Sequence, residues 1–149
     1  MGVDIHVYVT KRDKVNNCYH WIKIFDKNGN LIPAYEERNY SLFDALNDNP
    51  NNTNFASIPE ICFDKDFLKE FKESQDIGFY GWGMINLADL KLYAMNPIHF
   101  DSNNEYGDEI NKTTFDKFIN KIESYAEIGL YNEWGYHTSD IFIFFWFDH

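Results

Sequence analysis

Side chains at the two ends of the chain have the types that bind a divalent metal or activate water. Asp4 and His6 are two residues apart, so in a strand both point to the same face. If the last strand lies beside the first, Asp148 and the terminal His149 approach them. Such a set would hold a metal that activates water for hydrolysis. The alternative is a polar sheet face on which Asp4 and His6 bond to each other or to neighbouring loops.

A second candidate site stands before a predicted helix. Arg38 is one of two arginines in the chain and precedes a helix start at Ser41, where free backbone N–H groups favour anions. Arg38 and Asn39 would bind a phosphate or carboxylate, and Tyr40 would stack on a base. The alternative is internal, with Arg38 paired to a nearby carboxylate and Tyr40 packed on the helix.

Two clusters of aromatic residues suit stacking on nucleobases or contact with another protein. They occupy residues 78–83 and 131–137, and we expect both to be loops. The first lacks the Lys-Ser/Thr ending of a phosphate-binding loop. The alternative is a lid of rings over the core. The residues of interest are Tyr80, Trp82, Trp134, Tyr136 and His137.

Composition limits the classes of partner. With 24 acidic against 13 basic side chains, the net charge is −11 and the pI about 4.7. Direct binding of duplex DNA needs Lys and Arg to replace the counterions of the phosphates, so it is excluded. Mimicry of nucleic acid, or a nucleotide held in one local pocket, stays open. No apolar run of about 18 residues and no signal-peptide pattern is present, so we expect no membrane association.

The two cysteines, Cys18 and Cys62, match no metal-binding spacing and indicate no disulfide framework. Neither belongs to a Cys/His motif for nucleophilic catalysis. A reduced, cytoplasmic protein is the simplest interpretation.

The elements that must position these residues follow from hydrophobic periodicity. Residues 3–10 alternate apolar and polar, which predicts a half-buried strand, and a second strand over 18–25 forms a hairpin with it. Asn28-Gly29 predicts a tight turn. The closing run, 140–148, is apolar on both faces and predicts a central strand. Helices are expected from Ser41, from Asp64 to Glu73, from Asn86 to Met95, and from Thr114 to Ile128.

Strand and helix patterns mix without regular alternation. We therefore predict a single α+β domain over 1–149. Its mainly antiparallel sheet contains the first and last strands and is packed with three to four helices.

Three segments resemble a family of small phage and prophage proteins. The chain begins Met-Gly-Val-Asp-Ile-His, carries Arg-Asn-Tyr-Ser-Leu-Phe at 38–43 and closes with Phe-Trp-Phe-Asp at 145–148. Members of that family begin Met-Gly-Cys-Asp-Ile-His, carry Arg-Asn-Tyr-Asp-Leu-Phe and end in an apolar strand with Phe-Asp-Asn. Val3 stands where the family has Cys, and residues 78–87 lack the histidines of the family's His-rich stretch.

The resemblance implies a phage origin, and small phage accessory proteins often antagonise host immunity. We therefore expect a phage-encoded accessory protein that acts in the host cytoplasm by binding, not by turnover. Its partner would be a host defence protein, such as a nuclease whose basic channel it blocks as an acidic mimic of nucleic acid, or a nucleotide signal that it sequesters.

Two alternatives remain open. One is a metal-dependent hydrolase that uses Asp4, His6 and Asp148 and would need a divalent metal; apart from this alternative, no cofactor is expected. The other is a structural or assembly partner of a phage particle, which would form a defined homo-oligomer.

Overall fold

The computed structural model describes residues 4–35, 37, 40–96, 100, 112–131, 133 and 135–148. Its strands are β1 (Asp4–Asp13), β2 (Cys18–Trp21), β3 (Ile24–Phe25), β4 (Leu31–Ile32), β5 (Tyr80–Asn86) and β6 (Ile141–Asp148). Its α-helices are α1 (Tyr40–Asn47), α2 (Lys65–Ile77), α3 (Leu87–Ala94) and α4 (Lys112–Gly129). Short 3-10 helices are η1 (Phe55–Ser57), η2 (Glu60–Cys62) and η4 (Thr138–Asp140). Among these described helices, none is long and apolar enough to cross a membrane.

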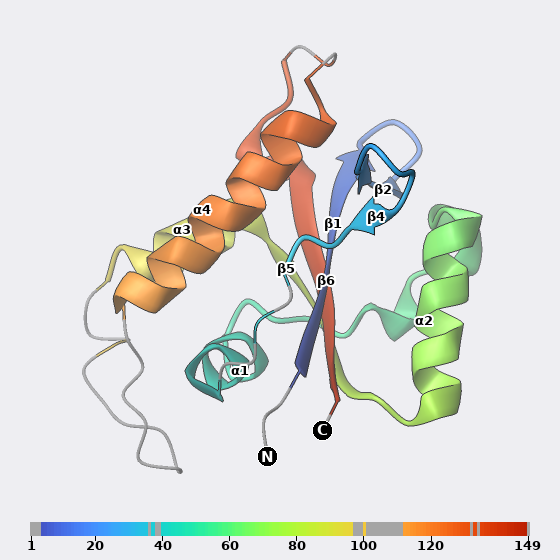
Figure 1. The fold of residues 1–149 in the computed structure, drawn as a ribbon. Coiled ribbons are helices and arrows are strands. Elements are labelled where there is room, and N and C mark those ends of the chain that lie inside the picture. Colours follow the sequence, from blue (N-terminus) through green and yellow to red (C-terminus); the bar gives the residue numbers. More distant parts are fainter. Residues whose placement is uncertain are drawn as a thin grey trace.

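The main sheet has four antiparallel strands in the order β2-β1-β6-β5. The first and last strands are neighbours, and their register runs from Asp4 opposite Asp148 to Lys11 opposite Ile141. The first and last residues that the structure describes therefore lie side by side (Figure 1). The predicted α+β class, with a mainly antiparallel sheet that contains the first and last strands, is confirmed.

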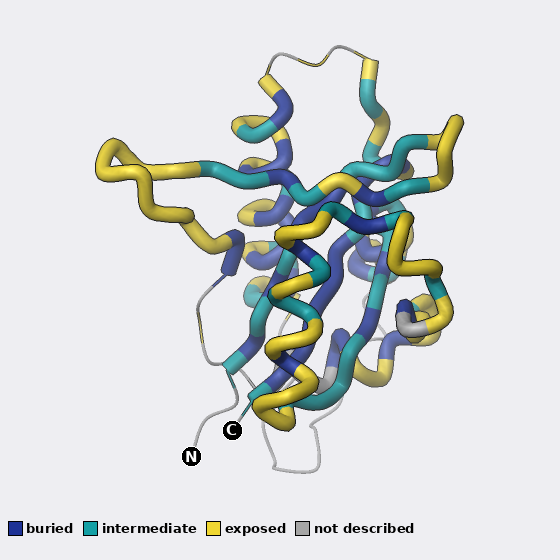
Figure 2. Tube along the Cα trace, turned by 90° about the vertical axis from the view of Figure 1, so that its right-hand side faces the viewer, coloured by how far each residue is buried: buried dark blue, intermediate teal, exposed yellow. Residues whose placement is uncertain are grey.

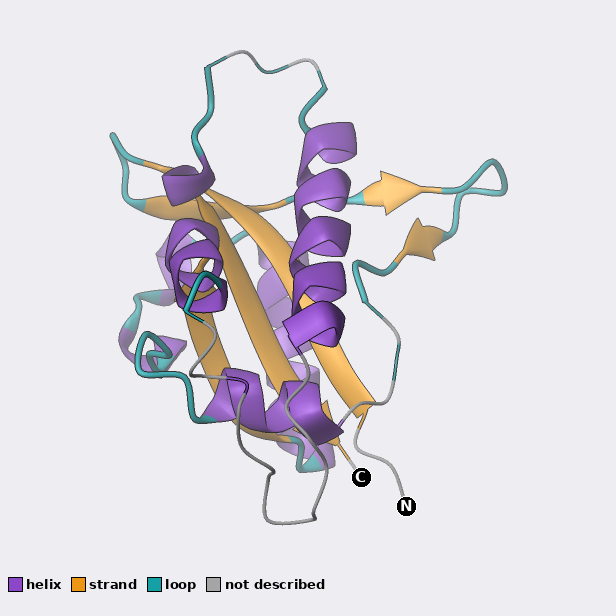
Figure 3. Cartoon of the chain, turned by 90° about the vertical axis from the view of Figure 1, so that its left-hand side faces the viewer, coloured by secondary structure: helices purple, strands orange, loops and turns teal. Residues whose placement is uncertain are grey.

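Helices cover both faces of this sheet. Figures 1 and 3 show α3 and α4 on one face and α2 on the other. β6 lies between the layers, so its side chains are buried on alternate sides over nearly its whole length. This explains why the sequence of β6 is apolar on both faces, as a central covered strand requires.

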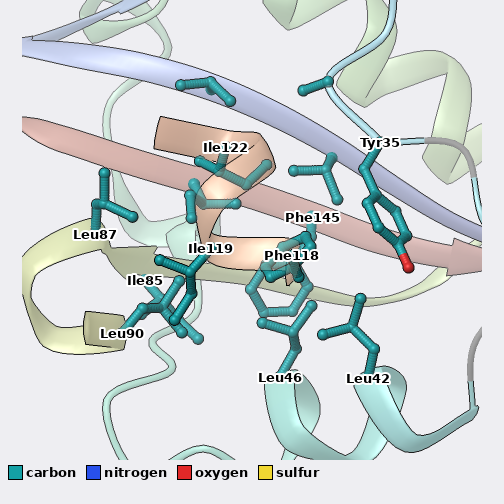
Figure 4. Packing of buried hydrophobic residues seen from close by; sticks show 14 of the residues in the cluster. Tyr35, Leu42, Leu46, Ile85, Leu87, Leu90, Phe118, Ile119, Ile122 and Phe145 are labelled. Atoms are coloured by element: carbon teal, nitrogen blue, oxygen red, sulfur yellow. The ribbon is translucent and has the colours of Figure 1, made fainter. Parts of the chain in front are cut away.

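The first core lies between the sheet and α1, α3 and α4. The predicted helix over 114–128 is confirmed as α4, and its apolar residues recur at spacings of three and four. Phe118 and Ile122 of α4 point toward Phe145 of β6, and Leu46 of α1 and Leu90 of α3 complete the packing (Figure 4).

The second core, on the α2 face, is almost entirely aromatic. Phe144 and Trp146 of β6 pack with Phe55 of η1, with Phe63 from the segment that leads into α2, and with Phe67 of α2 itself. Their rings meet mainly edge to face or tilted, the arrangements that aromatic quadrupoles favour.

Two elements differ from the sequence prediction. β2 ends at Trp21 instead of continuing to Phe25, and Ile24–Phe25 pairs with Leu31–Ile32 across the predicted turn, where Gly29 has φ of 81°. This β3–β4 hairpin projects from the sheet and is largely exposed (Figure 2). The glycine-aromatic stretch, expected to be a loop, is strand β5, paired with β6 across a bulge between Tyr80 and Gly83.

Candidate functional site

The feature that distinguishes this sheet is an unpaired length of β1. β2 pairs with β1 only over Thr10–Asp13, and the last bond between them runs from the Ile22 N–H to the Val9 carbonyl at 2.9 Å. Within the described residues, the remainder of β1 has β6 as its single strand neighbour. Because backbone groups alternate between the two sides of a strand, Ile5 and Val7 point theirs to the same open side as Val9.

The other edges of the sheet are covered. Phe63 forms a bridge to Tyr19 on the outer side of β2, and Thr53 forms one to Met84 on the outer side of β5. Native sheets cover or shorten their edges in this way to prevent pairing with other chains. The open part of β1, Ile5–Tyr8, is the exception in the described part of the chain.

A cavity of about 350 Å³ lies along this open edge. Its lining comes from both layers of the molecule, so this groove straddles the edge of β1. Ile5 and Val7, which belong to the first core, are only 3% and 6% exposed. A volume of this size is typical of a ligand site. Apart from Asp4–Val9, the lining residues are Trp21, Leu31, Pro33, Ala34, Tyr35, Glu70 and Tyr125.

The wall of this groove on the α2 side is acidic. Glu70 accepts a hydrogen bond from the Tyr8 hydroxyl at 3.3 Å. Burial, followed by the nearby carboxylates of Glu70 and Glu73, raises the pKa of Tyr8 far above its usual range. Tyr8 therefore stays a neutral donor, and the carboxylates of Glu70 and Glu73 keep their negative charge beside the groove.

His6 and Asp148 form a second polar feature at the end of the groove. The Nε2 atom of His6 lies 2.6 Å from Oδ2 of Asp148, and the ring stacks on Phe79 with centroids 5.0 Å apart. The side chains are 35% and 18% exposed, so solvent reaches both. A carboxylate that orients an imidazole is an arrangement used in acid–base catalysis.

The structure thus brings together two of the three residues expected to bind a metal, and Asp4 is the cross-strand partner of Asp148. Yet no group of three or more His, Cys, Asp or Glu side chains in the described residues is placed to hold a metal ion. His149 lies outside those residues. The metal-dependent hydrolase stays a prediction.

The aromatic residues singled out from the sequence do not gather in one place. Trp82 donates from Nε1 to Ser74 Oγ at 3.0 Å and packs on the α2 face, whereas Tyr80 packs against Phe147 on the opposite face. Tyr136 packs against the first core, and the His137 N–H donates to Asp140. These two pairs lie at opposite ends of β6.

The predicted anion site cannot be placed. Arg38, Asn39 and Trp134 lie outside the described residues, and of Tyr40 only the backbone is described, as the first residue of α1. Their proposed role as ligand-binding residues stays a prediction.

A larger cavity, of about 650 Å³, lies at the other end of β1. Its basic side chains are largely neutralised: Lys11 pairs with Glu133, and Lys14 lies 3.1 Å from Asp140. The guanidinium of Arg12 lies over the Phe142 ring, 5.1 Å from its centroid. Since most of these cations already have a carboxylate, this cavity is a weaker candidate for an anion site than its lining suggests.

Asp140 at this cavity predicts a dependence of stability on pH. Burial works to raise the pKa of its carboxyl, but the His137 N–H and Lys14 outweigh burial and lower that pKa. The stabilisation is therefore present above the unfolded-state pKa and is lost as pH falls through the folded-state value. Asp140→Asn should cost about 1 kcal/mol at pH 7 and much less at pH 3, measured by urea unfolding. A gap between wild type and variant that does not change with pH would contradict this.

Comparisons with known proteins add no identity. No protein-family model, curated protein or solved structure matches the chain. The function must therefore be argued from the groove itself.

Sequence reasoning missed the residues that make the groove. Trp21 lies in β2, Tyr35 in the loop after β4 and Glu70 in α2, and no short motif links them. The one available signal was the spacing of Asp66, Glu70 and Glu73, which puts three carboxylates on one face of α2.

Proposed function

We propose that this protein is a binding protein that captures an extended, positively charged segment of another protein along the open edge of β1. An added strand would bond to the backbone groups of Ile5 and Val7, as in other complexes formed by strand addition. The observation that supports this proposal is the cavity along an edge strand that lacks a described neighbour.

The two walls of the groove predict the side chains of the captured segment. Side chains of an added strand alternate between the two faces of the sheet. On one face they meet Glu70; on the other they meet Leu31, Tyr35 and Tyr125. Alternating basic and apolar residues therefore suit the groove.

Charge favours a basic protein over a nucleotide. The chain carries a net charge of −11, which attracts a basic partner over a distance and speeds association. The carboxylate wall repels phosphate. Of the two partner classes raised by the sequence, a host defence protein such as a nuclease fits this groove better than a nucleotide signal. A phage origin and a role against host defence are part of this proposal.

A capped peptide of about six alternating Arg and Val residues tests it. We expect the peptide to bind in low salt and to weaken as salt rises, because the attraction is screened. An analogue of this peptide, N-methylated at the amides that would face β1, should bind at least about tenfold more weakly, since it loses backbone donors. A Glu/Val peptide should not bind. Equal binding of the methylated analogue would refute docking on the edge.

A matched pair of variants tests the acidic wall. Glu70→Gln keeps an acceptor for Tyr8 and removes one charge, and we expect binding of the Arg/Val peptide to weaken several-fold. Asp89→Asn removes the same charge from α3, beside β5 and away from the open edge, and should leave binding unchanged. Equal losses in both variants would mean that only overall charge matters.

A second copy of this chain is the alternative occupant of the open edge of β1. Its own net charge opposes such pairing at low salt. Sedimentation of the free protein should therefore show a monomer, and a dimer that the Arg/Val peptide cannot dissociate would overturn the proposal.

A further inference from the structure

The outer side of β2 is joined to the segment that precedes α2. Tyr19 and Phe63 form an isolated parallel bridge. Next to it, the Trp21 N–H donates to Asp64 Oδ2 at 2.7 Å, and His20 Nδ1 lies 3.1 Å from Asp64 Oδ1. Asp64 stands at the N-cap position of α2, but its carboxylate bonds to β2 and makes no cap bond to the helix.

This parallel register places the two cysteines opposite each other. Cys18 precedes Tyr19 in β2, and Cys62, the last residue of η2, precedes Phe63, so each lies one residue before the bridge. Backbones joined by such a bridge lie about 4.8 Å apart, within the Cα separation that a disulfide spans. Both thiols are free and only partly buried, and the Cys62 thiol is close enough to raise the pKa of Cys18.

We propose that Cys18 and Cys62 are a modification site at which a reversible disulfide fastens the start of α2 to β2. Sequence spacing did not predict this pair, because its two members are separated by the β3–β4 hairpin and α1. The inference rests on residues outside the groove of β1 and does not depend on the proposed function.

The oxidant is a low-molecular-weight disulfide such as oxidised glutathione. One cysteine thiolate attacks a sulfur of that disulfide, forms a mixed disulfide and releases one glutathione as thiolate. The second cysteine, after losing its proton to water, attacks the protein sulfur of the mixed disulfide and releases the second glutathione. The protein loses two protons and two electrons, and the oxidant becomes two thiols.

The surroundings of Cys18 set the rate of this exchange. Partial burial and the adjacent Cys62 thiol raise the pKa of the Cys18 thiol, and the carboxylates of Asp13 and Asp64 add to the rise. His20, two residues along β2, lies 3.1 Å from Asp64 through its Nδ1 atom and is the cross-strand partner of Lys11. Because only the thiolate reacts, exchange should be slow near pH 7 and about tenfold faster for each unit that pH rises toward that pKa.

Closing the disulfide should stabilise the fold. It would cross-link two segments far apart in the sequence and remove freedom from the unfolded chain. For a domain of this size we expect Tm to rise by about 6–12 °C. α2, which carries Glu70, would be held on the sheet more firmly.

The experiment exposes the folded, reduced protein to oxidised glutathione at pH 8 and follows its intact mass and Tm. We expect a monomer that has lost about 2 Da, with the higher Tm, reversed by a reducing phosphine. Cys18→Ser and Cys62→Ser should each stop at a single glutathione adduct, without the rise in Tm. The double variant should keep the Tm of the reduced protein with or without the oxidant. Two adducts on wild type, a cross-linked dimer or no reaction would overturn the proposal.

Discussion

Phe144→Ala is expected to destabilise the protein by about 3–5 kcal/mol. Phe144 is fully buried in β6, and its ring lies 4.9 Å from that of Phe55 and 5.2 Å from that of Phe67. Truncation removes ring contacts and leaves a cavity that the surrounding rigid aromatic rings fill poorly. Urea unfolding followed by tryptophan fluorescence measures the loss.

Phe25→Ala is the matched control. Phe25 lies in β3 and is 56% exposed, so the same truncation should change stability by less than about 0.5 kcal/mol. If Phe144→Ala cost no more than this control, the α2 face would not be a packed core, and the placement of α2 on the sheet would be wrong.

Hydrophobic periodicity predicts which residues of an element are buried, but not the element that buries them. The sequence indicated that 140–148 is covered on both sides, and β6 confirms it. In the helix predicted from Asp64 to Glu73, Phe67 is buried in the second core, and Leu68 and Phe71 pack against it. That α2 alone among the described α-helices lies on this face depends on contacts between distant segments, which a single sequence does not display.

The glycine-rich stretch shows a different limit. Three glycines within 78–83 favour a loop by local propensity. In the structure, a Cβ on Gly83 would lie 2.2 Å from Asn52 Oδ1 and 2.5 Å from Phe145 Cζ. The glycine therefore permits close packing of a strand against its neighbours, a reason that appears only once β5 is paired with β6.

The candidate site, too, was predictable only in part. Asp4, His6 and Asp148 could be linked because strand alternation and the pairing of the first and last strands were both predictable. The open edge of β1 could not, because it depends on where β2 ends. β2 was expected to reach Phe25, but it turns away after Trp21 and leaves Ile5 and Val7 without a described partner on that side. The groove is a consequence of this early departure.

Phe118→Ala tests the opposite face of the sheet and is expected to cost about 3–5 kcal/mol. Phe118 is 2% exposed in α4 and meets the Tyr35 ring edge to face at 5.1 Å. It lies among residues of α1, α3, β5 and β6 (Figure 4). Denaturant titration gives the loss, and Ile128→Ala, at a position 61% exposed on the same helix, is the control. A loss under about 1 kcal/mol would mean that this face of α4 is assigned wrongly.

The two cores share strand β6, and this predicts how both variants unfold. β6 supplies Phe145 to the first core and Phe144 to the second, so neither core can lose its packing while β6 keeps its place in the other. Each variant should therefore unfold in one transition, with coincident midpoints for far-UV and near-UV circular dichroism. In the Phe118→Ala variant, the α4 face of the sheet could instead unfold first while the near-UV signal of the aromatic α2 face persists. The two layers would then be separate folding units that only share a strand.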